Sequence, residues 1–282
     1  MNTIWSENIQ GIMTLYLSRK LRFDDRFQSQ YQNLFGIDHR RTCRILEIGC
    51  GPGAMAGSLH RWYPNAEITA IDRDSRFIAF AKDHEPGILF VEGDAAALPF
   101  PDDSFDVTIS YAVQEHIEPA AFWGEQKRVL STGGFCICIS ARRGVTLPAK
   151  CLAATKEEIH FWNSIPGGND TLKTYNVGKY WLNESELPLQ MEEYGFRNVS
   201  TGYTLIELTP DNPGCSDEFA ERIMEAQRQS DLEAVWNARA DDSDKIIAII
   251  NRKYNMRRKL YREGIPQWDT LISLSMIVRG EA

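Results

Sequence analysis

The sequence predicts an α/β fold that is built on a doubly wound parallel sheet. Between Arg44 and Ser140, short runs rich in β-branched residues alternate with segments of helical periodicity. This alternation is typical of βαβ units, in which crossover helices cover both faces of a parallel sheet. Because the crossovers are right-handed, they restrict the topology to a doubly wound arrangement. The length of 282 residues fits one large domain or two small ones.

The composition excludes several classes of protein. Hydrophobic residues make up 43% and charged residues 25% of the chain, which is enough apolar surface for a core and excludes extensive disorder. The net charge of −8 argues against a nucleic-acid partner, since binding phosphates requires a positive field. No apolar run reaches the roughly 18 residues of a membrane span, and the N-terminus does not resemble a signal peptide. We therefore expect a cytoplasmic protein, whose oligomeric state the sequence does not specify.

The expected elements begin with helices and continue as alternating strands and helices. Residues 6–35 have helical periodicity and define a helical cap at 1–40, ahead of a main domain at 41–282. Strands are expected at Ile45–Ile48, Glu67–Ile71, Ile88–Val91, Phe105–Ser110, Phe135–Ser140, Asn198–Leu208 and Leu271–Val278. Helices are expected between them at Ala54–Tyr63, Ser75–His84, Ala120–Leu130 and Glu184–Tyr194.

Two long segments interrupt this alternation, at 145–182 and at 211–265. The first carries Pro166 and the pair Gly167–Gly168 among several aromatic residues, and it follows the carboxyl end of a strand. A long excursion from that edge is more typical of a lid or a substrate wall than of a linker. The second segment is helical, and we expect both segments to roof a pocket whose other side is closed by the N-terminal helices.

The clearest local motif is a glycine-rich turn between the first strand and the helix that follows it. The run RILEIGCGPG places Gly49, Gly51 and Gly53 where a ligand approaches the backbone. With Ala54, the run also fits the G-x-G-x-x-A pattern, so the turn by itself leaves a nicotinamide-binding domain open.

Asp72 is the second candidate, because it closes the second strand about 20 residues after the glycine turn. A carboxylate at this place accepts hydrogen bonds from the hydroxyls of a ribose. The alternative is a helix N-cap, a role for which Asp74 competes. The position does not distinguish a nicotinamide cofactor from other adenosine ligands.

A third motif separates these ligands. The third strand is followed by Gly93–Phe100 and then by Pro101–Val107. In this order, the glycine turn, Asp72 and the two blocks resemble the class I S-adenosylmethionine-dependent methyltransferases. The resemblance covers Arg44 to Ser140 and is strongest to the small-molecule, ubiquinone/menaquinone-type subgroup with a methyltransferase-11-like domain. It implies a Rossmann-like sheet of seven strands, with an antiparallel last strand between strands five and six.

The resemblance also implies S-adenosylmethionine as the cofactor, S-adenosylhomocysteine as its product, and a small organic acceptor. It assigns the methionine part of the cofactor to Glu47 and the glycine turn, the ribose to Asp72 and the adenine to Asp94. The residues it implies in cofactor binding are Glu47, Gly49, Cys50, Gly51, Gly53, Asp72, Arg73, Asp94, Ala95, Ser110 and Gln114.

His116 and Tyr111 are the candidates for catalysis, because they follow the fourth strand at the edge where doubly wound sheets bind ligands. His116 would act as a general base toward a hydroxyl or an acidic carbon. The alternative is a histidine at a helix start that is bonded to the backbone. Trp162, Tyr180 and Trp181 are candidates for binding the acceptor, with aromatic core beneath the loop as the alternative.

We expect no metal site. The six cysteines contain no C-x-x-C pair, and Glu157 with His160 is a single pair on a helix, below the two pairs of a di-iron site. The basic run Arg252–Arg262 indicates either contact with RNA or an acidic partner, or a solvated helix face. The acidic balance of the whole chain favours the solvated face.

The function expected from the sequence is methyl transfer to a small organic acceptor by in-line displacement. Whether oxygen, nitrogen or carbon is methylated is left open. A nicotinamide-dependent oxidoreductase is an alternative, although it would lack the Gly93–Asp106 block. A noncatalytic cofactor-binding module would lack an acceptor-sized pocket, and the basic helix is the only indication of an RNA or protein methyltransferase.

Overall fold

The computed structural model describes residues 5–282 except 166–171, 173, 176, 239 and 241. The Pro166–Gly168 part of the expected lid therefore lies outside the described residues.

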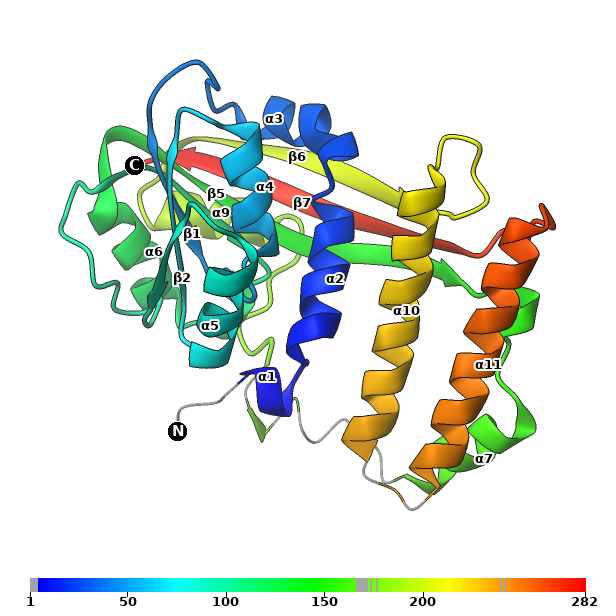
Figure 1. Cartoon of the computed structure of the whole chain (residues 1–282). Helices are drawn as coiled ribbons and strands as arrows, with labels where there is room; N and C mark the ends of the chain where they lie inside the picture. The colour runs from blue at the N-terminus through cyan, green and yellow to red at the C-terminus, as the bar shows by residue number, and fades with distance from the viewer. Residues whose placement is uncertain (1–4, 166–171, 173, 176, 239, 241) are drawn as a thin grey trace. The chain divides into compact units, whose positions relative to one another are not determined.

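Seven strands form one sheet in the order β3-β2-β1-β4-β5-β7-β6. Figure 1 shows β7 running against its neighbours β5 and β6. The doubly wound sheet with an antiparallel last strand between strands five and six is thus confirmed. The strands are β1 Arg44–Ile48, β2 Glu67–Asp72, β3 Leu89–Glu92, β4 Phe105–Tyr111, β5 Leu130–Leu147, β6 Arg197–Leu208 and β7 Thr270–Glu281.

The register of the central strands brings three strand ends together. β1 pairs in parallel with both β2 and β4, so that Ile48 lies opposite Ile71 on one side and Ser110 on the other. These three strands end at the same edge of the sheet. The segments that leave them therefore meet there, as the fold class requires for a ligand site.

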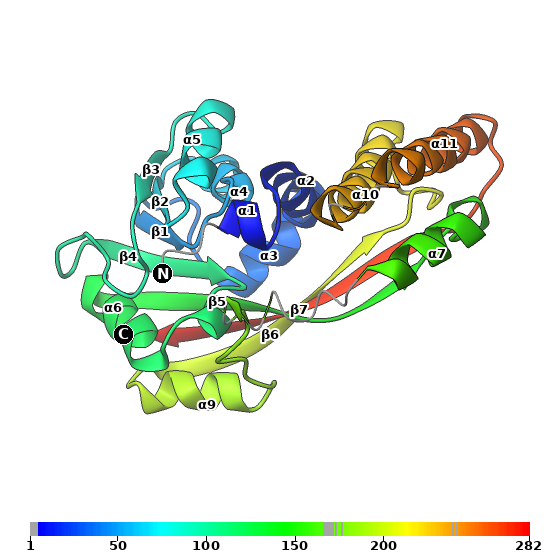
Figure 2. The same ribbon diagram turned by 90° about the horizontal axis from the view of Figure 1, so that it is seen from below.

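Helices cover both faces of this sheet (Figure 2). α4 and α5 lie on one face, where α2 packs against both, and α9 lies on the other. On the second face α6 and α9 share a core with β5 and β7 that contains Trp123, Met191 and Met276. The elements are α1 Trp5–Asn8, α2 Ile12–Arg22, η1 Asp25–Phe27, α3 Gln28–Phe35, α4 Ala54–Trp62, α5 Ser75–His84, η2 Gln114–His116, α6 Pro119–Val129 and α9 Glu186–Glu193.

The chain divides into two compact units. The sheet unit comprises Met1–Arg143, Leu172–Leu205 and Leu274–Ala282, and the helical unit comprises Gly144–Thr171 and Ile206–Ser273. The helices of the helical unit are η3 Lys150–Leu152, α7 Lys156–Ser164, α10 Asp217–Ala238 and α11 Ser243–Arg262. They enclose a core of their own, which contains Phe161, Leu232, Val235, Ile246, Ile250 and Tyr254.

The largest differences from the sequence prediction lie in β5 and in the N-terminal segment. β5 begins at Leu130 and continues to Leu147, well beyond the predicted end at Ser140. Its residues after Ser140, ARRGVTL, include two arginines and a glycine, which interrupt the apolar run that predicted the strand. Pairing continues there because Gly144 allows a close approach: a Cβ at this position would lie 2.7 Å from the backbone oxygen of Ile272. The N-terminal segment is also more broken than predicted, since Asp24 caps a short 3-10 helix between α2 and α3.

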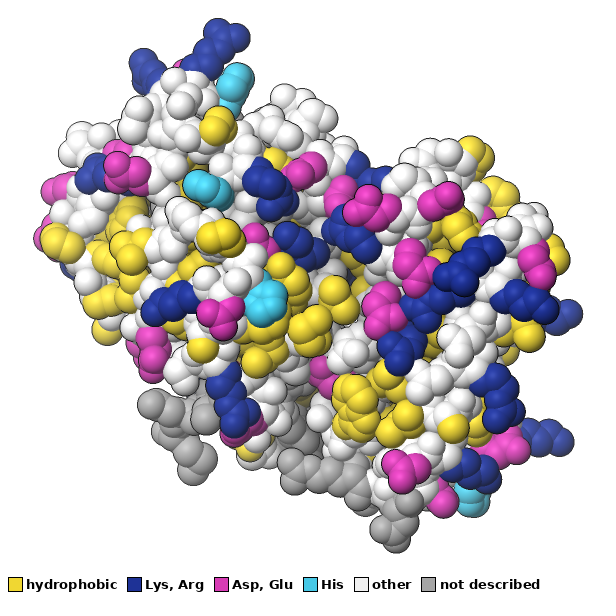
Figure 3. All heavy atoms as spheres, viewed as in Figure 1, with side chains coloured by type: hydrophobic (Ala, Val, Ile, Leu, Met, Phe, Trp, Pro, Cys, Tyr) yellow, Lys and Arg dark blue, Asp and Glu magenta, His cyan; other side chains and the backbone are white. Residues whose placement is uncertain are grey.

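The basic run Arg252–Arg262 lies on α11, where charges are paired inside the helical unit. Arg258 binds Glu225 of α10, with 2.5 Å between Nη2 and Oε2. Lys253 Nζ lies 2.8 Å from Oε1 of Glu158. Figure 3 shows acidic and basic side chains interspersed over this part of the surface. This pattern supports the interpretation as a solvated, salt-bridged helix.

Arg257 holds α11 to the connections on either side of it. Its side chain is fully buried, and Nη2 lies 2.7 Å from Asp211 Oδ2 and 2.6 Å from Asp269 Oδ1. Asp211 also accepts hydrogen bonds from the backbone nitrogens of Gln267 and Trp268, at 3.0 and 2.8 Å. The loops at the end of the helical unit therefore depend on one buried cation.

We expect Arg257→Met to lower the free energy of unfolding by about 3–5 kcal/mol, because it leaves two buried carboxylates without their cation. Urea unfolding followed by tryptophan fluorescence measures the loss. The matched control is Arg262→Met at the exposed end of the same helix, for which we expect a change within about 0.5 kcal/mol. Equal losses in the two variants would contradict this role of Arg257.

Candidate functional site

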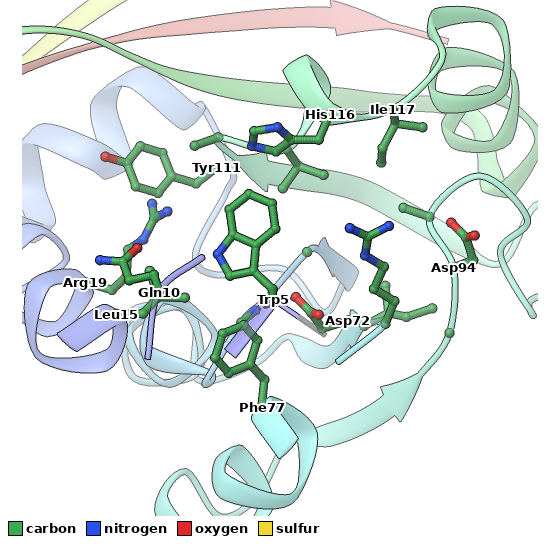
Figure 4. Close-up of a pocket in the computed structure, with 18 residues that line it drawn as sticks. Trp5, Gln10, Leu15, Arg19, Asp72, Phe77, Asp94, Tyr111, His116 and Ile117 are labelled. Carbon is green, nitrogen blue, oxygen red and sulfur yellow. Dashed lines mark hydrogen bonds between the residues drawn. The ribbon is translucent and has the colours of Figure 1, made fainter. Parts of the chain in front are cut away.

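A cavity of about 180 Å³ opens at the edge where β1, β2 and β4 end (Figure 4). It lies within the sheet unit, and its walls come from the segments that follow these strands and from α1 and α2. The predicted site residues that line it are Gly49, Gly51, Asp72, Arg73, Asp94, Ala95, Tyr111 and His116. A smaller cavity of about 30 Å³ shares several of these walls and adds Glu47 and Cys50.

The turn after β1 follows its course because two glycines adopt left-handed conformations. Gly49 and Gly51 have φ values of 70° and 54°. A Cβ on Gly49 would lie 2.4 Å from Cγ2 of Val113, and one on Gly51 would lie 3.2 Å from Cδ2 of Leu15. Side chains are therefore disfavoured at both positions, and the cavity is bounded here by bare backbone.

Asp72 is fixed beside this turn at the end of β2. Its Oδ2 accepts a hydrogen bond from the backbone nitrogen of Gly51 at 2.8 Å, and its Oδ1 accepts one from Asp74 at 2.9 Å. Burial raises the pKa of the Asp72 carboxyl, and the two hydrogen bonds oppose that rise. The N-cap of α5 is Asp74, whose Oδ1 accepts from the nitrogen of Arg76 at 3.0 Å. Asp72 therefore remains available to a ligand.

Asp94 lies at one end of the cavity, in the loop after β3 (Figure 4). Its Oδ1 accepts a hydrogen bond from the backbone nitrogen of Ala96 at 2.9 Å, which fixes the side chain over its own turn. Ala95 between them also lines the cavity. An exposed carboxylate suits the polar edge of a base.

Arg19 lies at the opposite end, and the sequence analysis did not find it. It comes from α2, and its guanidinium carbon lies 3.7 Å from the centre of the Tyr111 ring. Its Nη1 is buried without a hydrogen-bond partner among the described residues. Burial lowers the pKa of Arg19 to about 10, so the group is charged at neutral pH. No motif marks this residue, because its place depends on how α2 packs on the sheet unit.

Glu47 lines the smaller cavity together with Arg19. Its side chain is 2% exposed, and its Oε2 has no partner within the described part of the chain. Burial raises the pKa of Glu47 well above its ordinary value, and the charge of Arg19 opposes this. One end of the site thus holds a buried cation and a buried carboxyl, each with an unused polar atom.

Three predicted cofactor residues do not line either cavity. Ser110 is completely buried in β4, and Gln114 donates from Nε2 to the backbone oxygen of Tyr180 at 3.1 Å. Gly53 begins α4 in a left-handed conformation, where a Cβ would lie 2.9 Å from that of Ala81. These residues were predicted from positions in the motifs alone, and the structure gives each of them a packing role.

His116 lines the large cavity, but backbone contacts fix its ring. Its Nδ1 accepts a hydrogen bond from the nitrogen of Gly178 at 2.9 Å, which places the proton of the neutral ring on Nε2. Burial, with the charge of Arg73, lowers the pKa of His116 to about 4, against an opposing hydrogen bond to the backbone of Ala112. This arrangement favours the backbone-bonded interpretation, because the lone pair that a general base needs is occupied.

The aromatic residues predicted to bind the acceptor do not line the cavity. Trp162 belongs to the helical unit, where its ring packs edge-on against Phe161. The nitrogen of Tyr180 donates to the oxygen of Glu115 at 2.9 Å, and Trp181 is 56% exposed. An indole that does line the cavity is that of Trp5 in α1, which is far in the sequence from the aromatic segment that suggested an acceptor wall.

Within the described ranges, no three His, Cys, Asp or Glu side chains gather into a group that could hold a metal ion. The same part of the chain holds no helix with the length and apolarity to span a membrane.

Comparison with known proteins gives the family of this domain. A sequence profile of the methyltransferase domain family matches residues 46–138, which include the glycine turn, Asp72 and Asp94. The chain contains a class I S-adenosylmethionine-dependent methyltransferase domain.

Individual relatives match different lengths of this chain. The chain is 43% identical over 96 residues to probable phthiotriol/phenolphthiotriol dimycocerosates methyltransferase 2 of Mycobacterium ulcerans, covering 33% of this chain and 37% of the relative. It is 28% identical over 214 residues to demethylmenaquinone methyltransferase of Roseiflexus castenholzii, covering 72% of this chain and 84% of the relative. The chain thus spans well under half the length of the first relative.

A solved structure shares the fold of this chain. Phosphoethanolamine N-methyltransferase 2 of Haemonchus contortus, in complex with S-adenosyl-L-methionine, superposes with a TM-score of 0.56 over 99% of this chain and 60% of its own. The sequence identity is 12%, so the likeness shows the fold alone.

The geometry of His116 predicts how the stability of the protein depends on pH. The folded ring stays neutral down to about pH 4, while the unfolded chain takes up a proton near the ordinary pKa of 6.5. The unfolded state therefore binds more protons between these values, and the fold loses stability as the pH falls from 6.5 toward 4.

Urea unfolding at several pH values measures this effect. The wild type should lose stability more steeply in that window than His116→Gln, whereas the exposed His39→Gln control should follow the wild type. Nitrogen chemical shifts should also show a neutral ring with its proton on Nε2 at pH 6. A charged His116 at that pH would contradict the assignment.

Proposed function

We propose that this chain transfers a methyl group from S-adenosylmethionine to a small organic acceptor by in-line displacement. The observation that carries the proposal is the order of groups along one cavity: Arg19 at one end, Asp72 in the middle and Asp94 at the other end (Figure 4). The cofactor has the same order of chemical parts, which are a zwitterionic amino-acid group, a ribose and an adenine.

The unused polar atoms at the Arg19 end suit the amino-acid group. Arg19 Nη1 and Glu47 Oε2 are buried, and neither has a partner among the described residues. A guanidinium binds a carboxylate, and a carboxyl oxygen accepts from an ammonium group. A bound amino-acid group would satisfy both atoms, whose burial without a partner costs free energy. We therefore assign the carboxylate of the cofactor to Arg19 and its ammonium group to Glu47.

The remaining two acids are assigned to the nucleoside. A carboxylate offers about four lone-pair sites, and at Asp72 the nitrogens of Gly51 and Asp74 each use one. The others can accept from the two ribose hydroxyls. Asp94 and the backbone of Ala95 lie at the end of the cavity where the adenine would follow.

When bound, S-adenosylmethionine supplies an electrophilic methyl group. The residues of the cavity hold the two reactants in line and exclude water, and positioning of this kind accounts for much of the acceleration in such a displacement. The ring of His116 is held by backbone groups and shapes the cavity wall. We assign no general base, because this ring offers no free lone pair.

An apolar acceptor fits these surroundings best. The apolar residues among the remaining walls include Leu15, Val113 and Ile117. The relatives are named for demethylmenaquinone and for phthiotriol dimycocerosates, which supports an acceptor with a large apolar part. Whether oxygen, nitrogen or carbon receives the methyl group is a matter for experiment.

Asp72→Ala should weaken the binding of S-adenosylmethionine by about 1.5–3 kcal/mol, the range for hydrogen bonds to a charged group. Isothermal calorimetry measures the change, and the exposed Asp38→Ala is the matched control. Unchanged affinity in Asp72→Ala would remove the ribose assignment. Tight binding of NADH by the wild type would instead favour a nicotinamide-dependent oxidoreductase.

A screen with cofactor labelled in the methyl group tests the activity. We expect label in a small organic product when the panel includes quinone, phenol, carboxylic acid and amine acceptors with apolar chains. Label found only in RNA or protein would contradict the proposed acceptor class. Tight cofactor binding without transfer to any acceptor would favour the noncatalytic module.

A further inference from the structure

We infer that α1 is a latch over the cofactor cavity and that its Trp5 makes the site prefer a cationic sulfonium ligand to the neutral thioether product. The inference rests on the proposed function, because it takes this cavity to be the cofactor site. It concerns a part of the chain that carries none of the family motifs.

The contacts of α1 are those of a segment that can open. None of its residues is buried. Its backbone nitrogen at Ser6 donates to Oδ2 of Asp74 at 2.7 Å, and Glu7 forms an ion pair of 2.5 Å with Arg76. Tyr175 also donates to Oδ1 of Asn8 at 3.0 Å. The ion pair of Glu7 is exposed, and an exposed ion pair contributes little to stability. Because α1 contributes no buried residue, it can leave its place by breaking these few polar contacts, without opening the core of the sheet unit.

Asp74, which holds α1 in place, is also bonded to Asp72, the carboxylate that we assign to the ribose. Asp74 uses Oδ1 to cap α5 and Oδ2 to hold Ser6, so one carboxylate serves two helices. The backbone nitrogen of Asp74 in turn donates to Oδ1 of Asp72. The latch is therefore held by Asp74, two residues along the chain from Asp72, the carboxylate that we assign to the ribose.

The side chain of Trp5 extends from the latch into the middle of the cavity. Figure 4 shows its indole between the Arg19 end and Asp72, with Phe77 on one side and His116 on the other. The ring centres of Trp5 and His116 are 4.9 Å apart. With the amino-acid group at Arg19 and the ribose at Asp72, the sulfur that joins them would lie beside this indole.

An indole at this place distinguishes the two forms of the ligand by charge. The face of tryptophan attracts a cation more strongly than any other aromatic side chain does, and its contact with a neutral thioether sulfur lacks this charge attraction and is weaker. The neighbouring His116 does not offset this attraction, because its lowered pKa keeps the ring uncharged at neutral pH. The closed latch therefore favours the charged cofactor, and the neutral product is held less firmly.

Paired titrations with S-adenosylmethionine and S-adenosylhomocysteine test the inference. We expect Trp5→Leu to weaken binding of the methylated cofactor by about 5- to 30-fold and binding of the product by less than about threefold. Trp5→Phe should lie between Trp5→Leu and the wild type, because it keeps an aromatic face. The matched control is Trp236→Leu in the helical unit, where the indole is 49% exposed, and both affinities should stay as in the wild type.

Amide hydrogen exchange on the wild-type protein provides a readout that needs no variant. Exchange at residues 6–9 should slow more with S-adenosylmethionine than with S-adenosylhomocysteine at equal saturation, because the charged ligand holds the latch closed. Glu7→Gln, which removes the ion pair to Arg76, should speed dissociation of both ligands in stopped-flow measurements.

The outcomes separate this inference from the proposed function. A wild type that binds both ligands, with equal losses in Trp5→Leu, would overturn the inference and leave the cofactor site in place. Equal protection of residues 6–9 by the two ligands would overturn it as well. A wild type that binds neither ligand would overturn the proposed function, and the inference with it.

Discussion

The site depends on the hydrogen bond between the backbone of Gly51 and the carboxylate of Asp72. It joins the ends of β1 and β2 at 2.8 Å, and it forms only because the turn after β1 bends sharply toward the second strand. Gly49 makes that bend possible, since a Cβ there would lie 2.4 Å from Val113. The same contact positions bare backbone and a carboxylate side by side, which is the combination that an adenosine ligand requires.

The N-terminal helices supply the cavity walls that the strand ends do not. The motifs of the sheet provide acids and glycines, but the cation at one end of the cavity comes from Arg19 on α2, and the indole in its middle comes from Trp5 on α1. A sheet edge with these acids alone would leave Glu47 buried without a compensating charge. The N-terminal helices and the sheet therefore line one cavity, although they are separate in the sequence.

The sequence predicts those parts of the site that follow directly from strand ends. Asp72 and Asp94 close or follow parallel strands, so their place at the carboxyl edge depends only on the fold class. Ser110 shows the limit of this argument. The motif does not determine toward which face of the sheet a strand residue points, and the side chain of Ser110 is buried in the core. Arg19 depends on how one helix packs, and the proton position on His116 depends on Gly178, far along the chain. Such tertiary contacts leave no local pattern.

A crystal structure of the complex with S-adenosylhomocysteine tests the central claim most directly. The account predicts both ribose hydroxyls within hydrogen-bond distance of the Asp72 carboxylate, the ligand carboxylate on Arg19 and the adenine beside Asp94. A ligand bound outside this cavity, or one bound in it with its ribose away from Asp72, would contradict the account.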